Sequence, residues 1–310
     1  MTNNSITATI AVSGNPKHLF SCIESIQKLT QKIIIADIGA DTLLIQKLKS
    51  NYHPTIITYS KPIPYVELIR NDLIQAVQTE YVLVIDPDEL FPPSTIETIN
   101  KLIPKIDYFV FPRKNVLFGK WIQHSRWWPD YQLRVFRKTS VVWPKVIHSQ
   151  PIATKESKGH IFAQEEQTAI FHYNYETVHE YLIKSERYAL AESIKFDNLS
   201  PSEVVSQASQ TAVNEFMSRF FDAKGYKDGV QGLSLAHLQI YTSLLSAWLF
   251  FEKKEFPHIS EEELKKLAVL YFTHGADEAW YWYQQTTKQS TFKRIQTKLI
   301  RKLIRILTKL

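Results

Sequence analysis

The sequence predicts an α/β fold in which a mostly parallel sheet flanked by helices is followed by a helical C-terminal region. Short apolar runs rich in β-formers alternate with helical patterns through residues 6–85, which is the rhythm of βαβ units. Two of these runs end in aspartate, at the place where parallel strands present ligands. Beyond residue 176, the apolar residues recur at helical spacing.

The elements of the first half follow from these two periodicities. Each expected strand is a run rich in Ile, Val and Leu, and each expected helix repeats apolar residues every three to four positions. The expected strands are residues 6–12, 32–37, 55–59 and 81–85, and the expected helices between them are residues 19–29, 43–48 and 66–77. Helices that connect successive strands in this way predict an open, doubly wound parallel sheet.

The pattern changes after the fourth strand. A helix is expected over residues 94–103, with Ser94 as its N-cap and Glu97 as the capping-box partner. Strands are expected over residues 108–113, 131–137 and 169–173, separated by loops that hold Trp121, Trp127, Trp128 and Trp143. Long helices are expected over residues 176–196, 201–221, 232–251 and 260–283.

Three regions follow from this reading: an α/β domain over residues 1–175, a helical region over residues 176–285 that packs on or beside it, and a final helix over residues 286–310. The stretch 233–251 is strongly apolar but contains His237 and several hydroxyl side chains. A buried or interface-embedded helix is therefore favoured over a membrane-spanning one.

Composition narrows the class of protein. With 310 residues the chain can bury a sizeable core. Its single cysteine, Cys22, excludes an internal disulfide framework and fits a reducing compartment. Cys22 lies in a helical pattern, where a small core residue is favoured over a nucleophile. No signal peptide is visible in the polar N-terminal residues, so a cytoplasmic protein is expected.

The net charge of +6 is unevenly placed. Residues 291–310 hold seven Lys and Arg and no acid, so the rest of the chain is close to neutral. On a helix, the apolar residues of this tail fill one half and the cations the other, which is typical of a helix lying in an anionic membrane surface. A helix packed on the body or on a partner is the alternative. Nucleic-acid binding is not favoured, because it leaves the apolar half unexplained.

Acidic residues follow the fourth expected strand. Asp86, Asp88 and Glu89 come directly after an apolar run that suits the middle of a sheet. Such a strand is expected to end at the lip of a cleft, where Asp86 and Asp88 can hold a hard divalent cation. Asp37 ends the second strand on the same rim and is expected to hydrogen-bond a base or ribose. Gly39 allows the chain to turn beside that ligand.

No glycine-rich phosphate loop is present. Neither Gly-x-Gly-x-x-Gly nor Gly-x-x-x-x-Gly-Lys-Ser/Thr occurs among the eight glycines. A metal ion held by acids is the alternative way to neutralise a diphosphate.

The order of the motifs resembles the inverting glycosyltransferases of family 2, which have a GT-A fold, and in particular their lipopolysaccharide core glucosyltransferase-like subgroup. The motifs that carry the resemblance are residues 33–39 (Ile-Ile-Ile-Ala-Asp-Ile-Gly), Arg70-Asn71, residues 85–89 (Ile-Asp-Pro-Asp-Glu), residues 128–137 (Trp-Pro-Asp-Tyr-Gln-Leu-Arg-Val-Phe-Arg), residues 146–148 (Val-Ile-His), His172 and residues 225–229 (Gly-Tyr-Lys-Asp-Gly). It covers most of the chain to about residue 255. Three departures are the turn Val-Ser-Gly-Asn at residues 12–15, Asp-Ile-Gly-Ala-Asp at residues 37–41 in place of Asp-Ser-Gly-Ser-Thr-Asp, and Pro87 in place of the usual alanine.

The resemblance implies an enzyme of cell-envelope polysaccharide synthesis, peripheral at the inner face of the cytoplasmic membrane. It would transfer a sugar from a nucleotide-diphosphate donor, with a UDP-sugar favoured, to a glycan or lipid-linked acceptor. Mg²⁺ or Mn²⁺ is the implied cofactor, and residues 291–310 would contact the anionic membrane.

The expected site residues fall into four roles. Asp86 and Asp88 would bind the metal. Asp130 is the first candidate for the general base that inversion requires, and Glu89 is the second. The residues expected to bind the nucleotide are Asp37, Gly39, Arg70 and Asp86. The residues expected to contact the acceptor or a phosphate are Trp128, Arg134, Arg137, His148 and His172, although each histidine could equally be structural.

Two other classes of protein share parts of this pattern. A nucleotidyltransferase that makes the sugar nucleotide would have the same sheet and acids, but it usually carries a glycine-rich N-terminal loop that is absent here. A non-catalytic, membrane-docked subunit of a polysaccharide assembly complex would tolerate the altered turn at residues 12–15, although the intact Asp86 and Asp88 do not favour it.

Overall fold

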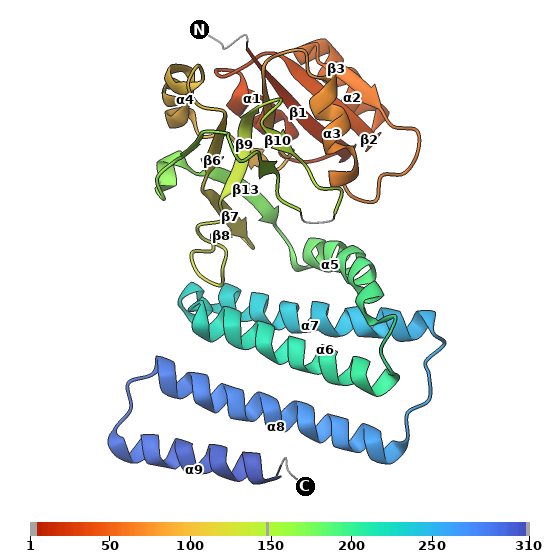
Figure 1. Cartoon of the computed structure of the whole chain (residues 1–310), viewed down its shortest axis with the longest axis vertical. Coiled ribbons are helices and arrows are strands. Elements are labelled where there is room, and N and C mark those ends of the chain that lie inside the picture. The colour runs from red at the N-terminus through yellow and green to blue at the C-terminus, as the bar shows by residue number, and fades with distance from the viewer. Residues whose placement is uncertain (1–4, 147–148, 308–310) are drawn as a thin grey trace. The chain divides into compact units, whose positions relative to one another are not determined.

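A computed structural model describes residues 5–146 and 149–307 of the chain (Figure 1). Two compact units are present. The first comprises residues 1–116 and 128–174, and the second comprises residues 117–127 and 175–310. The first unit is built on a seven-stranded sheet of order β12-β6-β9-β4-β1-β2-β3.

The first half of this unit forms as the apolar periodicity predicts. Its elements are β1 (Ile6–Gly14), α1 (Leu19–Ile26), β2 (Ile33–Ala40), α2 (Thr42–Tyr52), β3 (Thr55–Thr58), α3 (Glu67–Ala76) and β4 (Tyr81–Val84). The strand β1 pairs in parallel with β2 and with β4, and β2 pairs in parallel with β3. The carboxyl ends of these four strands therefore lie on one edge of the sheet.

The second half of the unit adds antiparallel pairing. Its elements are β5 (Glu89–Leu90), the 3-10 helix Pro93–Thr95, α4 (Ile96–Leu102), β6 (Tyr108–Phe111), β7 (Arg113–Leu117), β9 (Gln132–Arg137), β10 (Val141–Val142), β11 (Ile152–Ala153), β12 (Gly159–Ile161), the 3-10 helix Glu166–Thr168 and β13 (Ile170–Tyr175). The strand β9 runs antiparallel to both β4 and β6. Strands β5, β13 and β7 form a separate small sheet.

The expected capping box at Ser94 is wrong. The Ser94 hydroxyl donates to the carbonyl of Gln167 at 2.6 Å, and Thr95, the residue before α4, makes no side-chain cap. A serine hydroxyl can bond the backbone of another segment as readily as its own helix, and sequence spacing cannot distinguish the two.

Both faces of the large sheet are buried. On one face, residues of β1 such as Ile6 and Ile10 pack with Leu19 and Ile23 of α1. On the other, Ile34 and Val84 pack with buried residues of α3. A strand buried on both faces needs apolar residues at successive positions rather than alternating ones, which is why β4 reads as an unbroken apolar run.

The second unit is helical. It contains β8 (Lys120–Trp121), α5 (Val178–Glu192), the 3-10 helix Ser193–Phe196, α6 (Pro201–Phe216), the π-helix Met217–Asp222, the 3-10 helix Gly225–Asp228, α7 (Val230–Lys253), α8 (Glu261–Thr286) and α9 (Thr291–Leu307). Capping boxes begin α5 at Thr177 and α6 at Ser200. The fold class predicted from the sequence, a mostly parallel α/β sheet with a helical C-terminal region, is confirmed.

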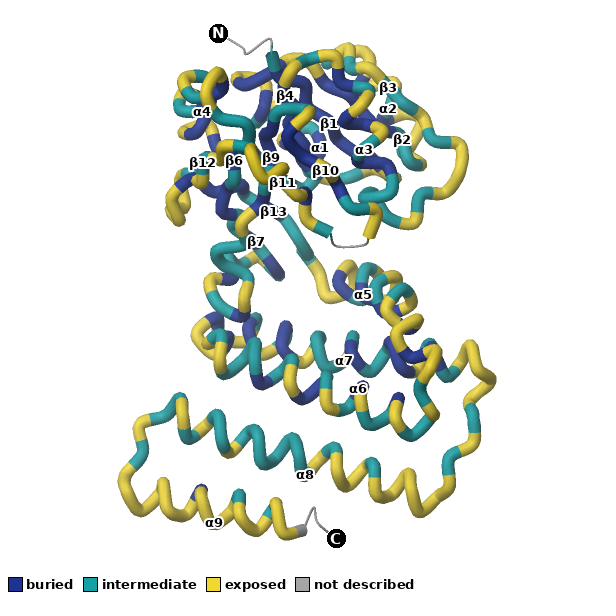
Figure 2. The backbone as a smooth tube through the Cα atoms, in the orientation of Figure 1, coloured by how far each residue is buried: buried dark blue, intermediate teal, exposed yellow. Residues whose placement is uncertain are grey.

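Fewer residues are buried in α8 and α9 than in α6 and α7 (Figure 2). The helices α6 and α7 share a core that includes Val204, Ala208, Ala247 and Phe250, whereas α8 has no buried residue. Within the described residues, α7 alone has the length and composition to cross a membrane, and about a third of its most apolar window is buried in the protein. Length and composition of this kind also occur in the core helices of soluble proteins.

Candidate functional site

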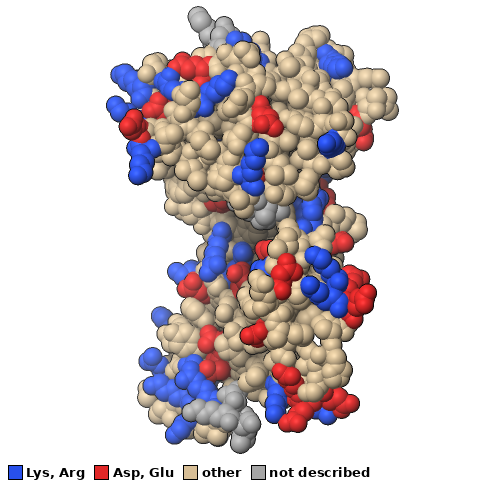
Figure 3. Space-filling view, turned by 45° about the vertical axis from the view of Figure 1, so that its right-hand side comes forward, with Lys and Arg blue, Asp and Glu red and all other residues tan. Residues whose placement is uncertain are grey.

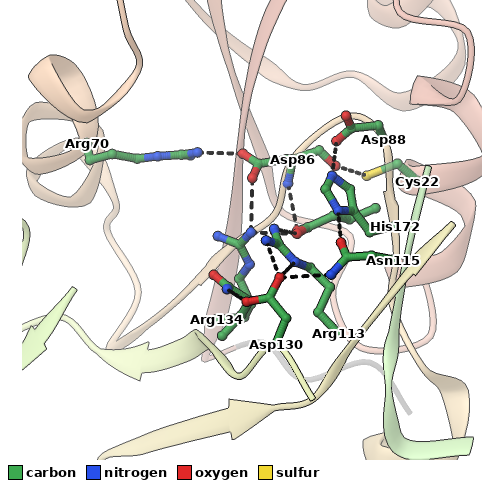
Figure 4. Close-up of polar contacts among 11 residues, drawn as sticks. Cys22, Arg70, Asp86, Asp88, Arg113, Asn115, Asp130, Arg134 and His172 are labelled. Carbon is green, nitrogen blue, oxygen red and sulfur yellow. Dashed lines mark hydrogen bonds and ion pairs between the residues drawn. The ribbon is translucent and has the colours of Figure 1, made fainter. Parts of the chain in front are cut away.

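The loop that follows β4 is the centre of the candidate site (Figure 4). It is folded tightly, because the Glu89 amide donates to the Asp86 carbonyl at 3.0 Å and the Asp86 amide donates to the Glu89 carboxylate at 3.2 Å. The Cys22 thiol of α1 also donates to the Asp86 carbonyl, at 3.3 Å. Pro87 is compatible with this loop, since it removes only one backbone donor.

Two guanidinium groups hold Asp86. Arg70 of α3 donates to Oδ1 at 2.5 Å, and Arg134 of β9 donates to Oδ2 at 3.0 Å. Arg134 also donates to Glu89 at 2.5 Å, and Arg113 of β7 donates to Glu89 at 3.1 Å. The Glu89 side chain is completely buried. Glu89 is therefore a buried counter-ion, and the prediction that it acts as a general base is corrected, because an acceptor hydroxyl has no access to it.

A second carboxylate, Asp130, is held from three sides. Its Oδ2 accepts from Arg113 at 2.8 and 2.5 Å and from Asn115 of β7 at 3.0 Å. Its Oδ1 accepts from Gln132 at 2.7 Å. The side chain keeps 24% of its surface exposed, so it stays accessible to solvent.

The arginines set the protonation states of these acids. Burial raises the pKa of Asp86, but the charges of Arg70 and Arg134 outweigh it and hold the pKa well below its usual value. At Asp130, burial raises the pKa and the charge of Arg113 lowers it, and the net effect is a lowered pKa. Burial lowers the pKa of Arg134 while Glu89 and Asp86 raise it, and the net effect is a raised pKa. All three groups are therefore ionised at neutral pH.

Asp88 faces a histidine rather than an arginine. Its Oδ1 lies 3.6 Å from Nε2 of His172 on β13, and the Nδ1 of His172 lies 2.6 Å from Oδ1 of Asn115. Since Asn115 uses its amide nitrogen on the Asp130 carboxylate, its oxygen must be the acceptor for His172. The Nδ1 of His172 therefore carries a proton, and in the neutral ring the lone pair of Nε2 points toward Asp88.

Arg70 has donors that the protein does not satisfy. Its side chain is almost completely buried, yet its Nε and Nη1 have no hydrogen-bond acceptor within the described part of the chain. The guanidinium lies 5.2 Å from the ring centre of Trp143, whose Nε1 also lacks an acceptor there. Asn71 fixes Trp143 by donating to its carbonyl at 2.7 Å. Buried donors without acceptors are costly, so this place suits a ligand that brings acceptors.

Asp37 lies at the carboxyl end of β2, on the same edge of the sheet. Its Oδ1 accepts from the amides of Gly39 at 3.1 Å and Ala40 at 2.9 Å. Gly39 has φ +109°, a conformation that L side chains rarely adopt. The predicted turn beside Asp37 is thus present.

Three other predicted site residues lie elsewhere or outside the described chain. Arg137 pairs with Tyr81 at the beginning of β4, and it is held there by Asp107 at 2.9 Å and by Glu80. Because β9 runs antiparallel to β4, Arg137 lies at the opposite end of the strand from Asp86, which corrects its expected contact with a phosphate. Trp128 is half-buried two residues before Asp130. His148 lies outside the described residues.

Arg113 and Asn115 are site residues that the sequence reasoning missed. They lie 17 and 15 residues from Asp130, on a strand of the small sheet. The signal available was the pattern Arg-Lys-Asn that begins at the last residue of the expected strand 108–113, since polar residues two positions apart on a strand share a face.

The acids fit a metal ion only in part. Among residues 5–146 and 149–307, no three His, Cys, Asp or Glu side chains converge on a point that could hold a metal. Both oxygens of Asp86 accept hydrogen bonds from guanidinium groups, so a cation at Asp86 would share these oxygens with Arg70 and Arg134. Asp88 and His172 remain as a pair of donors.

Sequence comparisons assign no family. No protein-family model matches the chain, and no curated protein matches its sequence.

Solved structures with some similarity include nucleotide-binding proteins. The chain is similar to S. aureus TarS 1–349 in complex with UDP-GlcNAc, at 12% identity over 90% of this chain and 81% of that one, with a TM-score of 0.42. Against the UDP complex the identity is 10%, over 84% and 93%, with a TM-score of 0.40. Against a longer TarS structure the chain spans 55% of that protein's length. Glucosyl-3-phosphoglycerate synthase from Mycobacterium tuberculosis, in complex with Mn²⁺, UDP and phosphoglyceric acid, is 17% identical over 37% of this chain and 44% of that one, with a TM-score of 0.27.

Proposed function

We propose that the chain is an inverting glycosyltransferase of family 2, which moves a sugar from a nucleotide-diphosphate donor, a UDP-sugar, to a hydroxyl group of a glycan or lipid-linked acceptor. The observation that carries the proposal is the pair formed by Asp88 and His172 beyond the carboxyl end of β4. Their facing atoms are 3.6 Å apart, so a small movement of either side chain would let both contact one cation at bond lengths of about 2.1 Å. Asp88 and His172 would hold Mg²⁺ or Mn²⁺, and substrate phosphates and water would complete the ligands.

The charge balance of the cluster supports a role for a cation. Arg70, Arg113 and Arg134 are each paired with Asp86, Glu89 or Asp130, and Asp88 adds a further negative charge. The cluster thus has no excess of positive charge to offer a diphosphate. A divalent ion, when bound, supplies that charge and stabilises the diphosphate as it leaves.

The hydrogen bonds that hold the ring of His172 support the same role. A histidine that binds a metal through one ring nitrogen commonly donates the N–H of the other to a carboxylate or carbonyl group. Here Asn115 accepts that N–H, and Asn115 is itself oriented by Asp130. The chain of contacts fixes the ring so that Nε2 faces Asp88.

The nucleotide has two suitable contacts on this edge of the sheet. The unsatisfied donors of Arg70 would hydrogen-bond oxygen atoms of the nucleotide. The carboxylate of Asp37, held by the turn at Gly39, would accept from a ribose hydroxyl or a base N–H. Both residues lie where open α/β sheets bind their ligands.

Asp130 is the general base in this proposal. It is ionised at neutral pH and is the more exposed of the two carboxylates that Arg113 contacts. Its lowered pKa makes it a weaker base than a free carboxylate. A proton accepted from the acceptor hydroxyl would come to Asp130, while Arg113 and Asn115 hold the carboxylate in place.

Substitution of Asp88 tests the proposed function. The change Asp88→Asn keeps the size of the side chain and removes the charge that a cation needs, so turnover of a UDP-sugar that depends on Mn²⁺ should be lost. The matched control is Asp197→Asn, which changes an exposed aspartate of the second unit and should retain full activity. Full activity of the Asp88→Asn variant would contradict the proposal.

Titration with UDP-, GDP- and ADP-sugars, with and without Mn²⁺, separates the proposal from its rivals. A transferase binds one nucleotide sugar more tightly with metal and turns it over. A nucleotidyltransferase instead requires a nucleoside triphosphate and a sugar phosphate, and a non-catalytic subunit binds without turnover.

The proposed location is the inner face of the cytoplasmic membrane, in cell-envelope polysaccharide synthesis. The basic and apolar residues of α9 support an anionic membrane surface as a partner, because this helix has no acid along its length. A lipid-linked acceptor would be presented at the same surface.

A further inference from the structure

The helix α9 packs on α8 through a polar side. Arg301 donates to Asp277 of α8 at 2.7 and 3.3 Å, and Arg305 donates to the same carboxylate at 3.0 Å. The Arg301 guanidinium also lies 4.8 Å from the ring centre of Tyr281. Thr297, one turn before Arg301, is buried. The side of α9 that faces α8 therefore contains Thr297, Arg301 and Arg305.

The apolar side of α9 faces away from α8. At 100° per residue, five large apolar side chains lie in one stripe, opposite Thr297 and Arg301. Each of them is more than half exposed; the stripe consists of Phe292, Ile295, Leu299, Leu303 and Ile306. A helix that folds back on its own protein normally buries such a stripe. Its exposure therefore indicates a surface that binds a membrane or another protein.

Four of the six cations of α9 divide into two groups. Arg301 and Arg305 are paired with Asp277. Burial raises the pKa of Asp277, but the hydrogen bonds and charges of the two arginines outweigh it, so the net effect is a lowered pKa. Lys298 and Lys302 are exposed and lie along the edge of the apolar stripe. Figure 3 shows Lys and Arg side chains gathered at the α9 end of the helical unit.

We propose that α9 docks on an anionic lipid bilayer while it stays folded on α8, with the apolar stripe in the lipid surface, Lys298 and Lys302 at the headgroups, and Arg301 and Arg305 retained by Asp277. The occupant is a bilayer because an apolar stripe with a cationic border and no acid complements anionic headgroups over acyl chains. The inference goes beyond the proposed function by dividing the basic residues of the tail into lipid contacts and contacts that fix the helix.

A fluorescence experiment tests which side of α9 meets the lipid. The probe is an environment-sensitive dye on a single introduced cysteine, Leu299→Cys or Arg294→Cys, in a Cys22→Ala background, because Cys22 is the one cysteine of the chain. With mixed phosphatidylcholine and phosphatidylglycerol vesicles, the emission at position 299 should shift to shorter wavelength and that at position 294 should not. No shift at position 299 would overturn the proposal, and concentration-dependent shifts without vesicles would assign the stripe to a second copy of the chain.

Affinity for the same vesicles tests the division of the cations. The double change Lys298→Gln and Lys302→Gln should weaken binding about 30-fold, from about fivefold for each lysine. The triple change Asp277→Asn, Arg301→Gln and Arg305→Gln replaces the paired groups with neutral ones and should change affinity less than about twofold. An equal loss in the two variants would show that the arginines face the lipid and would overturn the proposal.

The control substitution is Lys265→Gln, which removes an exposed cation near the acidic beginning of α8 and should leave affinity unchanged. Because these measurements use no turnover, their failure is distinct from failure of the proposed enzymatic function.

Discussion

At the scale of single residues, neighbours give each carboxylate of the cluster a different chemistry. Asp86 and Glu89 are tied to Arg134, whereas Asp88 faces the imidazole of His172. These three acids look alike in the sequence, and only the arginines that reach Asp86 and Glu89 distinguish them from Asp88, the proposed metal ligand. Those arginines come from strands and helices 16 to 48 residues away.

Removal of Arg134 should be strongly destabilising. The change Arg134→Met keeps an apolar stem of similar length but leaves Glu89 and Asp86 short of a partner, at an expected cost of about 3–5 kcal/mol. Urea denaturation measures it. The control Lys266→Met breaks an exposed pair with Glu262 and should cost less than about 1 kcal/mol, and an equal effect of the two changes would contradict the burial of the network.

Stability should fall on the acid side. The pKa values of Asp86 and Asp130 are lowered in the folded chain, so their contribution is present above the unfolded value of about 3.9 and is lost as the pH falls toward the folded values. The free energy of unfolding, measured between about pH 5 and pH 2, should decline more steeply in the native chain than in Asp130→Asn. Equal slopes would show that Arg113 does not hold Asp130.

At the scale of the elements, close packing decides where a glycine is required. A Cβ on Gly232 of α7 would lie 2.0 Å from the carbonyl oxygen of Gly225, whereas one on Gly275 of α8 would lie 3.7 Å from Val213, an ordinary contact. Helix propensity favours alanine at both positions. The two positions differ only in what the folded chain places beside them.

Alanine should therefore have opposite effects at these two glycines. Gly232→Ala should destabilise the chain by about 1–3 kcal/mol, because the backbone must move to relieve the overlap. Gly275→Ala should be neutral or stabilising by up to about 1 kcal/mol. Thermal or urea unfolding of the pair provides the measurement, and destabilisation by both would mean that α8 is packed more tightly than its exposure indicates.

At the scale of the whole molecule, the two units are stabilised differently. The first buries both faces of its sheet, while α8 and α9 of the second leave most of their large apolar residues exposed. The exposed apolar residues of α9 support the proposed membrane attachment through this helix.

Deletion of residues 291–310 should separate these two properties. The truncated chain should no longer sediment with anionic vesicles, while its turnover of a UDP-sugar with a soluble acceptor should be retained. Vesicle sedimentation and a transfer assay on the same preparation provide the comparison. If the truncated chain still sediments with vesicles, α9 is not the attachment site.

The sequence alone determined the order of strands and helices over residues 6–85, the mostly parallel sheet, the long C-terminal helices and the amphipathic tail. Each of these follows from an unbroken apolar run or from apolar residues at helical spacing. The short strands β5, β8, β10, β11 and β12 carry no such pattern. It also marked Asp37, Asp86 and Asp88, since acids after buried strands stand out in a linear pattern. What it could not provide was the position of Arg137 at the far end of β4, the partners of Asp130, or the side on which α9 packs. Only the tertiary structure decided these, because long polar side chains select their partners in space, across segments whose separation in the chain has no periodic signature.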